Sequence, residues 1–393
     1  MSKPEYHVPT MDEIRAVNKP GLVAASTFSG CGGSSLGYRM AGFEVRYANE
    51  FIEAARDTYA ANMEPYTFLD GRDVRDVKGV DIVEHCGGEV DLLDGSPPCS
   101  DFSTSGKREK GWGKVKEYSD GAQRVDDLFF EFARLVREVQ PKTFVAENVS
   151  GLVKGTAKGY FKWILRALRQ SGYRVEAKLL NAAWLGVPQA RQRLIFVGVR
   201  EDQPFDPIHP MPLPYQYTCR DVIGADAPLL VIHDPRGLYP VRNMTDVPAM
   251  TVTTRTAAHV QVWGGENVET DPETGESIVF RSYSLYETWK RLKIGTGAQE
   301  SRFNLKRINP DKPCLTILQT GGHPAEASVA HWDQPRKFTL AELRRLSAFP
   351  DDFILTGTYE QRYERIGRAV PPVMMYHVAA GIRDKLVEAR NNA

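Results

Sequence analysis

The residues of this chain that are best suited to chemistry include a cysteine that follows two prolines. Cys99 comes after Pro97 and Pro98, directly behind the apolar run 91–95. This run predicts a buried strand that ends at a stiff turn, because tandem prolines fix the backbone and remove amide donors. Cys99 would then stand at the carboxyl end of a sheet, where open α/β sheets bind ligands. A thiol there can act as a nucleophile, and the alternative is a buried structural cysteine.

A glycine-rich loop follows the first apolar run. Residues 22–28 predict a strand, and residues 29–33 form a loop that leads into a short helix. Glycines let a ligand approach the backbone, although the spacing departs from the dinucleotide fingerprint and a tight structural turn is the alternative. Glu50 ends the next predicted strand, twenty residues after Gly30, and an acid at this offset suits a ribose diol. Asp73 is a third acid that could end another strand.

Charged side chains also lie at the ends of two later predicted strands. Glu147 and Asn148 close the apolar run 143–149. A carboxylate at the carboxyl end of such a strand is a candidate for acid/base chemistry, and a helix cap is the alternative. Arg191 and Arg193 are spaced by one residue before another apolar run, so both should point to the same side and could clamp a carbonyl or a phosphate. A surface pair is the alternative.

These residues require a sheet whose strands alternate with helices. Apolar residues at helical spacing over 125–139 predict one such helix. Five prolines between residues 204 and 214 predict a linker, and strand–helix alternation returns only at about residue 337. We therefore expect an α/β catalytic and cofactor-binding domain over 1–200 that is completed by 337–393. An irregular, β-rich domain over 201–336 would be inserted between them.

The composition is that of an ordinary globular protein. The chain has 393 residues, of which 42% are hydrophobic and 25% are charged, and fifty basic residues balance fifty acidic ones. Five scattered cysteines without CxxC spacing indicate neither a disulfide framework nor a metal site, which fits a reducing compartment. No apolar segment has the length of a leader or a membrane span, so we expect a cytoplasmic protein with no membrane partner.

Two basic segments favour a nucleic acid as partner. Residues 107–116 are basic and contain glycine, which is typical of a surface loop that can bind phosphates. Between Trp289 and Arg307, six basic residues stand against one acid and are interleaved with aromatic residues. This second segment is the best candidate for a nucleic-acid patch in the chain. The alternative for the first segment is an ordinary solvated loop.

Taken in order, the motifs resemble those of the DNA cytosine-5 methyltransferases over nearly the whole chain. The matching segments are Phe28-Ser29-Gly30-Cys31-Gly32-Gly33, Pro98-Cys99 with Phe102-Ser103, Glu147-Asn148-Val149, the Gln-x-Arg-x-Arg motif ending at Arg193, residues 336–350 and residues 367–372. The resemblance implies a Rossmann-like, S-adenosylmethionine-dependent methyltransferase fold. The inserted lobe would be the target recognition domain. The chain departs from the family at Ser100, where Gln or Asn is usual, and at Arg368, where Asn is usual.

The resemblance also implies roles for individual residues. Cys99 would add to C6 of a flipped-out cytosine, Glu147 would contact N3, Arg193 would contact O2, and Arg191 would support the substrate or its backbone. The implied partner is double-stranded DNA and the implied state is a monomer, and the sequence leaves open whether a cognate restriction endonuclease exists. The implied cofactor-binding residues are Phe28, Ser29, Gly30, Cys31, Gly32, Gly33, Glu50, Phe51, Asp73, Val74, Gly95, Pro98, Leu128, Arg368, Ala369 and Val370.

Arg368 raises an alternative cofactor. A fixed cation beside a sulfonium is unfavourable unless an anion compensates it. Arg368 could turn away and pair with Glu364, or it could bind the extra carboxylate of carboxy-S-adenosylmethionine, in which case the product would be 5-carboxymethylcytosine. Two further alternatives are an RNA cytosine-5 methyltransferase and an inactive DNA-binding regulator. The long lobe and the intact Cys99, Glu147 and Arg193 favour a DNA-modifying enzyme.

Overall fold

The fold is described by a computed structural model. It covers residues 3–98, 115–118, 121–124, 128–153, 158–223, 271, 273–275, 288–298, 305–322, 329–334 and 336–392. A seven-stranded sheet forms the centre, in the order β3-β2-β1-β4-β7-β10-β8. Six of these strands point the same way, and β10 runs antiparallel to its neighbours β7 and β8. The seven strands are β1 (Leu22–Thr27), β2 (Phe43–Asn49), β3 (Phe68–Asp70), β4 (Leu92–Gly95), β7 (Thr143–Val149), β8 (Tyr173–Asn181) and β10 (Gln192–Arg200).

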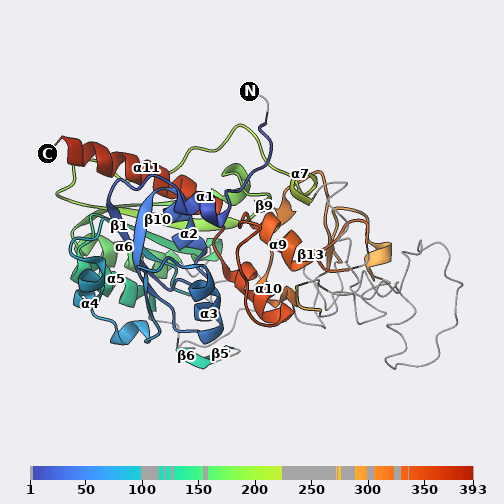
Figure 1. The fold of residues 1–393 in the computed structure, drawn as a ribbon, viewed down its shortest axis with the longest axis horizontal. Helices are drawn as coiled ribbons and strands as arrows, with labels where there is room; N and C mark the ends of the chain where they lie inside the picture. The colour runs from blue at the N-terminus through green and yellow to red at the C-terminus, as the bar shows by residue number, and fades with distance from the viewer. Residues whose placement is uncertain are drawn as a thin grey trace, which may run out of the picture.

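Helices cover both faces of the sheet, as Figure 1 shows. The first face carries α4 (Gly79–Cys86), α5 (Leu128–Val139) and α6 (Lys158–Gln170). The second face carries α2 (Gly33–Met40) and α11 (Pro372–Asn391). Successive residues of the inner strands β1, β4, β7 and β10 alternate between the two apolar cores, so these strands are buried on both sides. This arrangement confirms the predicted α/β sheet.

The carboxyl-terminal helix returns to the start of the chain. α11 packs along α2 so closely that a Cβ on Gly37 would lie 2.6 Å from Cβ of Met375. A glycine is therefore needed in α2 at this crossing. The sequence predicted that the tail packs back on the first domain, and the contact between these two helices agrees with that arrangement. Among the described residues, no helix is both long and apolar enough to span a membrane.

A third apolar core lies beside the sheet, and it is built by the short helices α1 (Met11–Arg15), α7 (Cys219–Ile223), α9 (Leu340–Leu346) and α10 (Tyr359–Arg368). Thr339 and Glu342 form a capping box that opens α9. The remaining elements are α3 (Glu53–Asn62), β5 (Val115–Tyr118), β6 (Gly121–Arg124), β9 (Gln189–Ala190), β11 (Lys306–Arg307), β12 (Cys314–Leu315), β13 (Val329–Ala330) and the 3-10 turns η1 (Val74–Asp76), η3 (Ser150–Val153), η5 (Ala182–Trp184) and η8 (Gln319–Gly322).

The proline-rich segment after β10 lies along the body of the protein. The guanidinium of Arg174 donates to the carbonyl oxygen of Gln203 at 2.7 Å, and Leu213 N donates to Trp184 O at 2.8 Å. Ile208 packs beside Gly381 of α11. Prolines cannot donate to a sheet ladder, so the segment is held by individual hydrogen bonds to Arg174 and Trp184 and by packing on α11. The segment that was predicted to be a linker therefore lies against the α/β domain.

Candidate active site

A row of polar side chains crosses the carboxyl edge of the sheet. Ser26 of β1 is in register with Asp94 of β4, and Asp94 is in register with Val145 of β7. Residues in register on neighbouring strands share a face, and so do residues two apart on one strand. Ser26, Asp94 and Glu147 therefore lie on one face of the sheet, the face that α2 and α11 cover.

Arg193 of β10 completes this row beside Glu147. Ile195 lies opposite Glu147 in the ladder, which puts Arg193 in the diagonal position on the same face. Nε of Arg193 lies 2.5 Å from Oε1 of Glu147, and both side chains are nearly buried. Burial lowers the pKa of Arg193, and the Glu147 carboxylate opposes that shift. The structure thus brings together the predicted acid/base residue and the predicted carbonyl clamp.

Asn148 ties strand β7 to the turn that precedes Cys99. Its Nδ2 donates to the carbonyl oxygen of Pro97 at 3.3 Å, and its Oδ1 accepts from Val149 N at 2.8 Å. The turn is therefore held next to Glu147. Pro98 is described and half-buried, whereas Cys99 itself lies outside the described residues, as does most of the basic segment 107–116.

The glycine loop is clamped by Glu50. Its carboxylate accepts from Gly30 N and from Ile52 N, each at 2.8 Å. Burial raises the pKa of Glu50, while these two amides and two nearby arginines oppose the shift. Each carboxylate oxygen has a further lone pair, so the same group can still accept from a ligand hydroxyl. The acid that was predicted to reach a ribose also shapes the loop.

Two residues of the loop show why its sequence is restrictive. A Cβ on Gly33 would lie 2.3 Å from Val370 O, so only glycine allows this approach. Phe28 has a φ of 53°, which is strained for a bulky side chain and costs about 1–3 kcal/mol. Strain of this kind gathers at ligand sites, and the sequence carried no signal for it. Gly32 also has a positive φ, of 92°, and caps α2.

These motifs recur in this order in a known family. Residues 23–384 match the family described as C-5 cytosine-specific DNA methylase. The chain belongs to this family. The match spans every site residue that the sequence predicted, from Phe28 to Val370.

Two relatives show how far the similarity extends. The Type II methyltransferase M.NgoFVII of Neisseria gonorrhoeae is 30% identical over 366 residues, which is 93% of this chain and 87% of the relative. The Type II methyltransferase M.PspPI of Psychrobacter sp. is 31% identical over 88% of this chain and 74% of the relative. A solved structure of a Spodoptera frugiperda DNMT2 mutant matches with a TM-score of 0.60 at 16% identity, covering 93% of this chain and 100% of that chain. That last likeness shows the shared fold.

Arg191 of this methylase binds groups within the protein. It is 2% exposed, and its guanidinium donates to the carbonyl oxygens of Ile317, Gly367 and Arg368 at 3.2, 2.9 and 3.2 Å. Burial and the neighbouring Arg193 hold its pKa well below the usual value. The guanidinium therefore joins the start of β10 to the segment around Ile317 and to the end of α10. These contacts are those of a positioning residue.

Several residues that the sequence assigned to cofactor binding lie inside the methylase core. Val74 and Leu128 are buried in the core under α5, and the Cys31 side chain is buried in the third core, where burial raises its pKa to about 11. The prediction that Asp73 could end a strand is wrong, because β3 ends at Asp70. Asp73 instead accepts from Arg75 N in a local turn.

Other predicted cofactor residues lie close to the glycine loop. Ala369 and Val370 both contact Gly33, and Ser29 begins the turn that leads into α2. Phe51 is half-buried and follows Glu50, and its carbonyl oxygen accepts from Arg56 at 2.5 Å. Gly95 is fixed by packing, since its Cβ would lie 2.3 Å from Phe132.

Arg368 follows the simpler of its two predicted conformations. Its Nε donates to Oε1 of Glu364 at 2.7 Å, one helical turn back in α10. Glu364 also pairs with Arg365 at 3.0 Å. The guanidinium of Arg368 is thus engaged by an acid of its own helix.

The predicted nucleic-acid patch is partly used inside the protein. Trp289 is 7% exposed, and the Arg307 guanidinium lies 4.0 Å from the centre of its ring. Arg307 also donates to the carbonyl oxygens of Trp332 and Leu292. These two residues therefore pack against each other within the protein. This corrects the prediction that both belong to a nucleic-acid patch. Arg302 lies outside the described residues.

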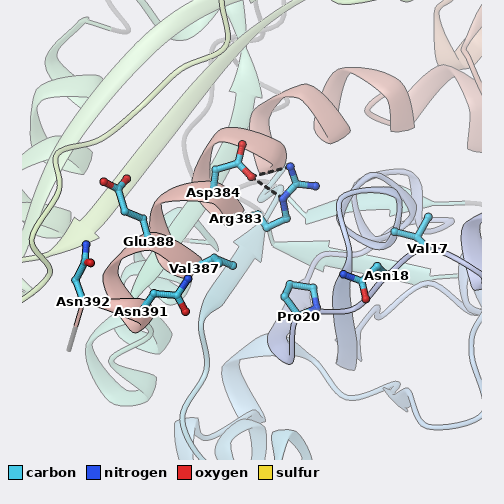
Figure 2. Close-up of a pocket in the computed structure, with 9 residues that line it drawn as sticks. All are labelled: Val17, Asn18, Pro20, Arg383, Asp384, Val387, Glu388, Asn391 and Asn392. Atoms are coloured by element: carbon cyan, nitrogen blue, oxygen red, sulfur yellow. Dashed lines mark hydrogen bonds and ion pairs between the residues drawn. The ribbon is translucent and has the colours of Figure 1, made fainter.

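A cavity of about 640 Å³ lies away from this site (Figure 2). It is formed by Val17, Asn18 and Pro20 and by the last turns of α11, where Arg383 pairs with Asp384 at 2.7 Å. Residues 17–20 precede β1, so the cavity lies at the amino edge of the sheet. None of the predicted site residues lines it.

Proposed function

We propose that this methylase transfers a methyl group to C5 of a cytosine flipped out of double-stranded DNA, through a covalent bond between Cys99 and C6. The buried pair of Glu147 and Arg193 carries this proposal. An ion pair at the carboxyl edge, next to a glycine loop and a turn leading to a cysteine, can stabilise charge on a ring that a thiolate attacks.

Cys99, Glu147 and Arg193 would each carry one part of the reaction. The thiolate of Cys99 adds to C6, and the electron pair of the C5–C6 bond moves toward C5 while charge develops at N3 and O2. Glu147 would hold a proton at N3 and Arg193 would donate to O2. After methyl transfer to C5, loss of the C5 proton and β-elimination restore the ring and free the thiolate. The ring face must be open to the thiolate, so the base has to leave the stack.

The loop around Gly30 fits S-adenosylmethionine as the donor. Its glycines leave room for a close approach, and the Glu50 carboxylate beneath it can accept from a ribose hydroxyl. When bound, S-adenosylmethionine supplies an electrophilic methyl group. Gly30, Gly32 and Glu50 would hold it, with Val370 closing the loop from the other side.

The first test identifies the modified nucleoside that the enzyme makes and asks whether its formation requires Cys99. With S-adenosylmethionine and varied double-stranded DNA, mass spectrometry of nucleosides should detect 5-methylcytosine for the parent and none for Cys99→Ala. Cys99→Ala should still shift DNA in a gel. Cys86→Ala is the matched control, because Cys86 is buried in α4 and should leave activity per folded molecule unchanged. A parent that yields no 5-methylcytosine on DNA, or that acts only on tRNA, would contradict the proposal.

We propose the ordinary cofactor over its carboxy analogue, because Arg368 already pairs with Glu364. In competition, the parent and Arg368→Asn should both yield 5-methylcytosine in preference to 5-carboxymethylcytosine, with little change in the ratio. A parent that makes mostly 5-carboxymethylcytosine, and an Arg368→Asn variant that loses this preference, would restore the carboxy-S-adenosylmethionine alternative.

The division of labour along the chain is part of the same proposal. Residues 1–200 and 337–393 would form the catalytic and cofactor-binding domain, and residues 201–336 would choose the target sequence. The relatives named as Type II methyltransferases support a modification enzyme that works beside a cognate restriction endonuclease. We propose that it acts as a monomer. Flipping one base per event needs only one copy of the site.

A further inference from the structure

A buried carboxyl group lies beneath the glycine loop and has no place in the mechanism above. Asp94 is 1% exposed and sits near the carboxyl end of β4. Its Oδ1 accepts from Tyr38 Oη at 2.7 Å, and its Oδ2 accepts from Ser26 Oγ at 2.9 Å. Its backbone oxygen also accepts from Thr27 Oγ1 at 3.0 Å. One aspartate thus joins strands β1 and β4 to helix α2.

The hydrogen bonds continue from Asp94 into the glycine loop. Ser29 Oγ lies 3.1 Å from Ser26 Oγ and 3.1 Å from Ser26 O. Ser29 O then accepts from Gly32 N at 2.9 Å, at the cap of α2. Because Ser26 donates its hydroxyl proton to Asp94, its oxygen is left to accept from Ser29. The hydrogen bonds therefore all run in one direction, from Ser29 through Ser26 to the carboxylate of Asp94.

The same strand leads to the nucleophile. Asp94 is followed by Gly95 and the Pro97-Pro98-Cys99 turn, so whatever fixes β4 against the glycine loop also relates the cofactor to the thiol. Polar networks in a buried site hold a unique arrangement when every member is satisfied. Here both carboxylate oxygens and both hydroxyl donors have partners.

We propose that Asp94 is a positioning residue that holds the glycine loop in its cofactor-binding conformation through Ser26, Ser29 and Tyr38. This inference rests on the proposed function, since it assigns the loop to S-adenosylmethionine. Asp94 acts through the loop and does not touch the reacting atoms.

The surroundings of Asp94 make its charge sensitive to pH. Burial raises its pKa to about 7, the hydrogen bonds from Tyr38 and Ser26 oppose that shift, and the Glu147 carboxylate on β7 adds to it. Within the described part of the chain, Tyr59 of α3 also interacts electrostatically with Asp94. The ionised form accepts from both hydroxyls, whereas the protonated form must give up one acceptor position. Affinity for the cofactor should therefore fall as the pH drops below about 7.

The decisive variant is Asp94→Asn, made in the full chain. The KM for S-adenosylmethionine should rise about tenfold at pH 8, while kcat at saturating cofactor stays within about threefold, because one lost charge-assisted hydrogen bond is worth about a factor of ten. The parent KM should rise toward the variant value between pH 8 and pH 6, and the variant KM should stay flat. Tyr38→Phe should raise KM less, and adding it to Asp94→Asn should have little further effect.

Stability separates this role from simple damage to the fold. The pKa of Asp94 is raised in the folded protein, so its contribution to stability is full below the unfolded pKa near 4 and is lost as the pH rises through about 7. Asp94→Asn removes the buried charge and should unfold no more easily than the parent at pH 8. Weaker cofactor binding in a variant of equal stability is what a positioning role predicts.

Asp91→Asn is the matched control, because Asp91 is buried at the amino end of the same strand and binds Val23 N and Lys142. It should leave the KM for S-adenosylmethionine unchanged. Titration calorimetry with S-adenosylmethionine alone gives the same comparison without DNA, so a failure of the methylation assay is distinguishable. Equal cofactor affinity in Asp94→Asn and the parent, or an unchanged pH dependence in the variant, would overturn the inference.

Discussion

Replacing Glu147 with glutamine is expected to lower kcat by about 10² to 10⁴, the usual effect of removing a general acid or base. Glutamine keeps the shape of the side chain and an oxygen that Arg193 can bind, but it cannot hold a transferable proton at N3. The measurement is single-turnover methylation of double-stranded DNA at saturating S-adenosylmethionine. Gel-shift affinity for the same DNA should change little, because the loss lies in the chemical step.

The control for this variant is Glu138→Gln. Glu138 of α5 also pairs with an arginine, Arg134, at 3.0 Å. Both residues lie in α5, away from the carboxyl edge of the sheet. Activity should remain at the parent level there. If Glu147→Gln retained kcat within about threefold of the parent, the assignment of Glu147 to N3 would be wrong.

Replacing Arg191 with methionine is expected to lower the free energy of unfolding by about 3 kcal/mol, because buried acceptors left without a donor cost about 1–3 kcal/mol each. The carbonyl oxygens of Ile317, Gly367 and Arg368 would all lose this partner. Removing a buried cation offsets part of the loss. Urea unfolding of the full chain measures the difference.

Two comparisons sharpen this result. Arg220→Met removes an exposed arginine that pairs with Asp311, and it should not change unfolding measurably. Arg193→Lys should instead keep most of the stability and lose activity, since Arg193 faces Glu147 at the edge of the sheet. If Arg191→Met unfolded like the parent and lost only activity, Arg191 would have to contact the substrate.

The strands and helices of the central sheet could be predicted from the sequence because local patterns carry them. The apolar run 143–149 coincides with β7, and the predicted strand at 22–28 coincides with β1 to within one residue. Strands buried on both faces are continuous apolar runs, and helices show a 3.6-residue period. The capping box at Thr339 is likewise a short-range signal.

The individual roles of neighbouring motif residues could not be read in the same way. Arg191 and Arg193 are two positions apart, yet one guanidinium binds carbonyls up to 177 residues away and the other binds Glu147. Trp289 and Arg307 looked like a surface patch, but they pack on each other. Asp94 had no sequence signal, since a single acid at a strand end is common.

By itself, the sequence determined the order of strands and helices, the family to which the chain belongs and the set of residues from which a site could be built. The tertiary structure decided which of those side chains meet. Only the fold brings Glu147 to Arg193, Arg191 to the carbonyl oxygens of α10, and Asp94 to Tyr38 and Ser26. The physical reason is that periodicity and turn chemistry act over a few residues, whereas hydrogen bonds and burial join segments that are far apart in the chain.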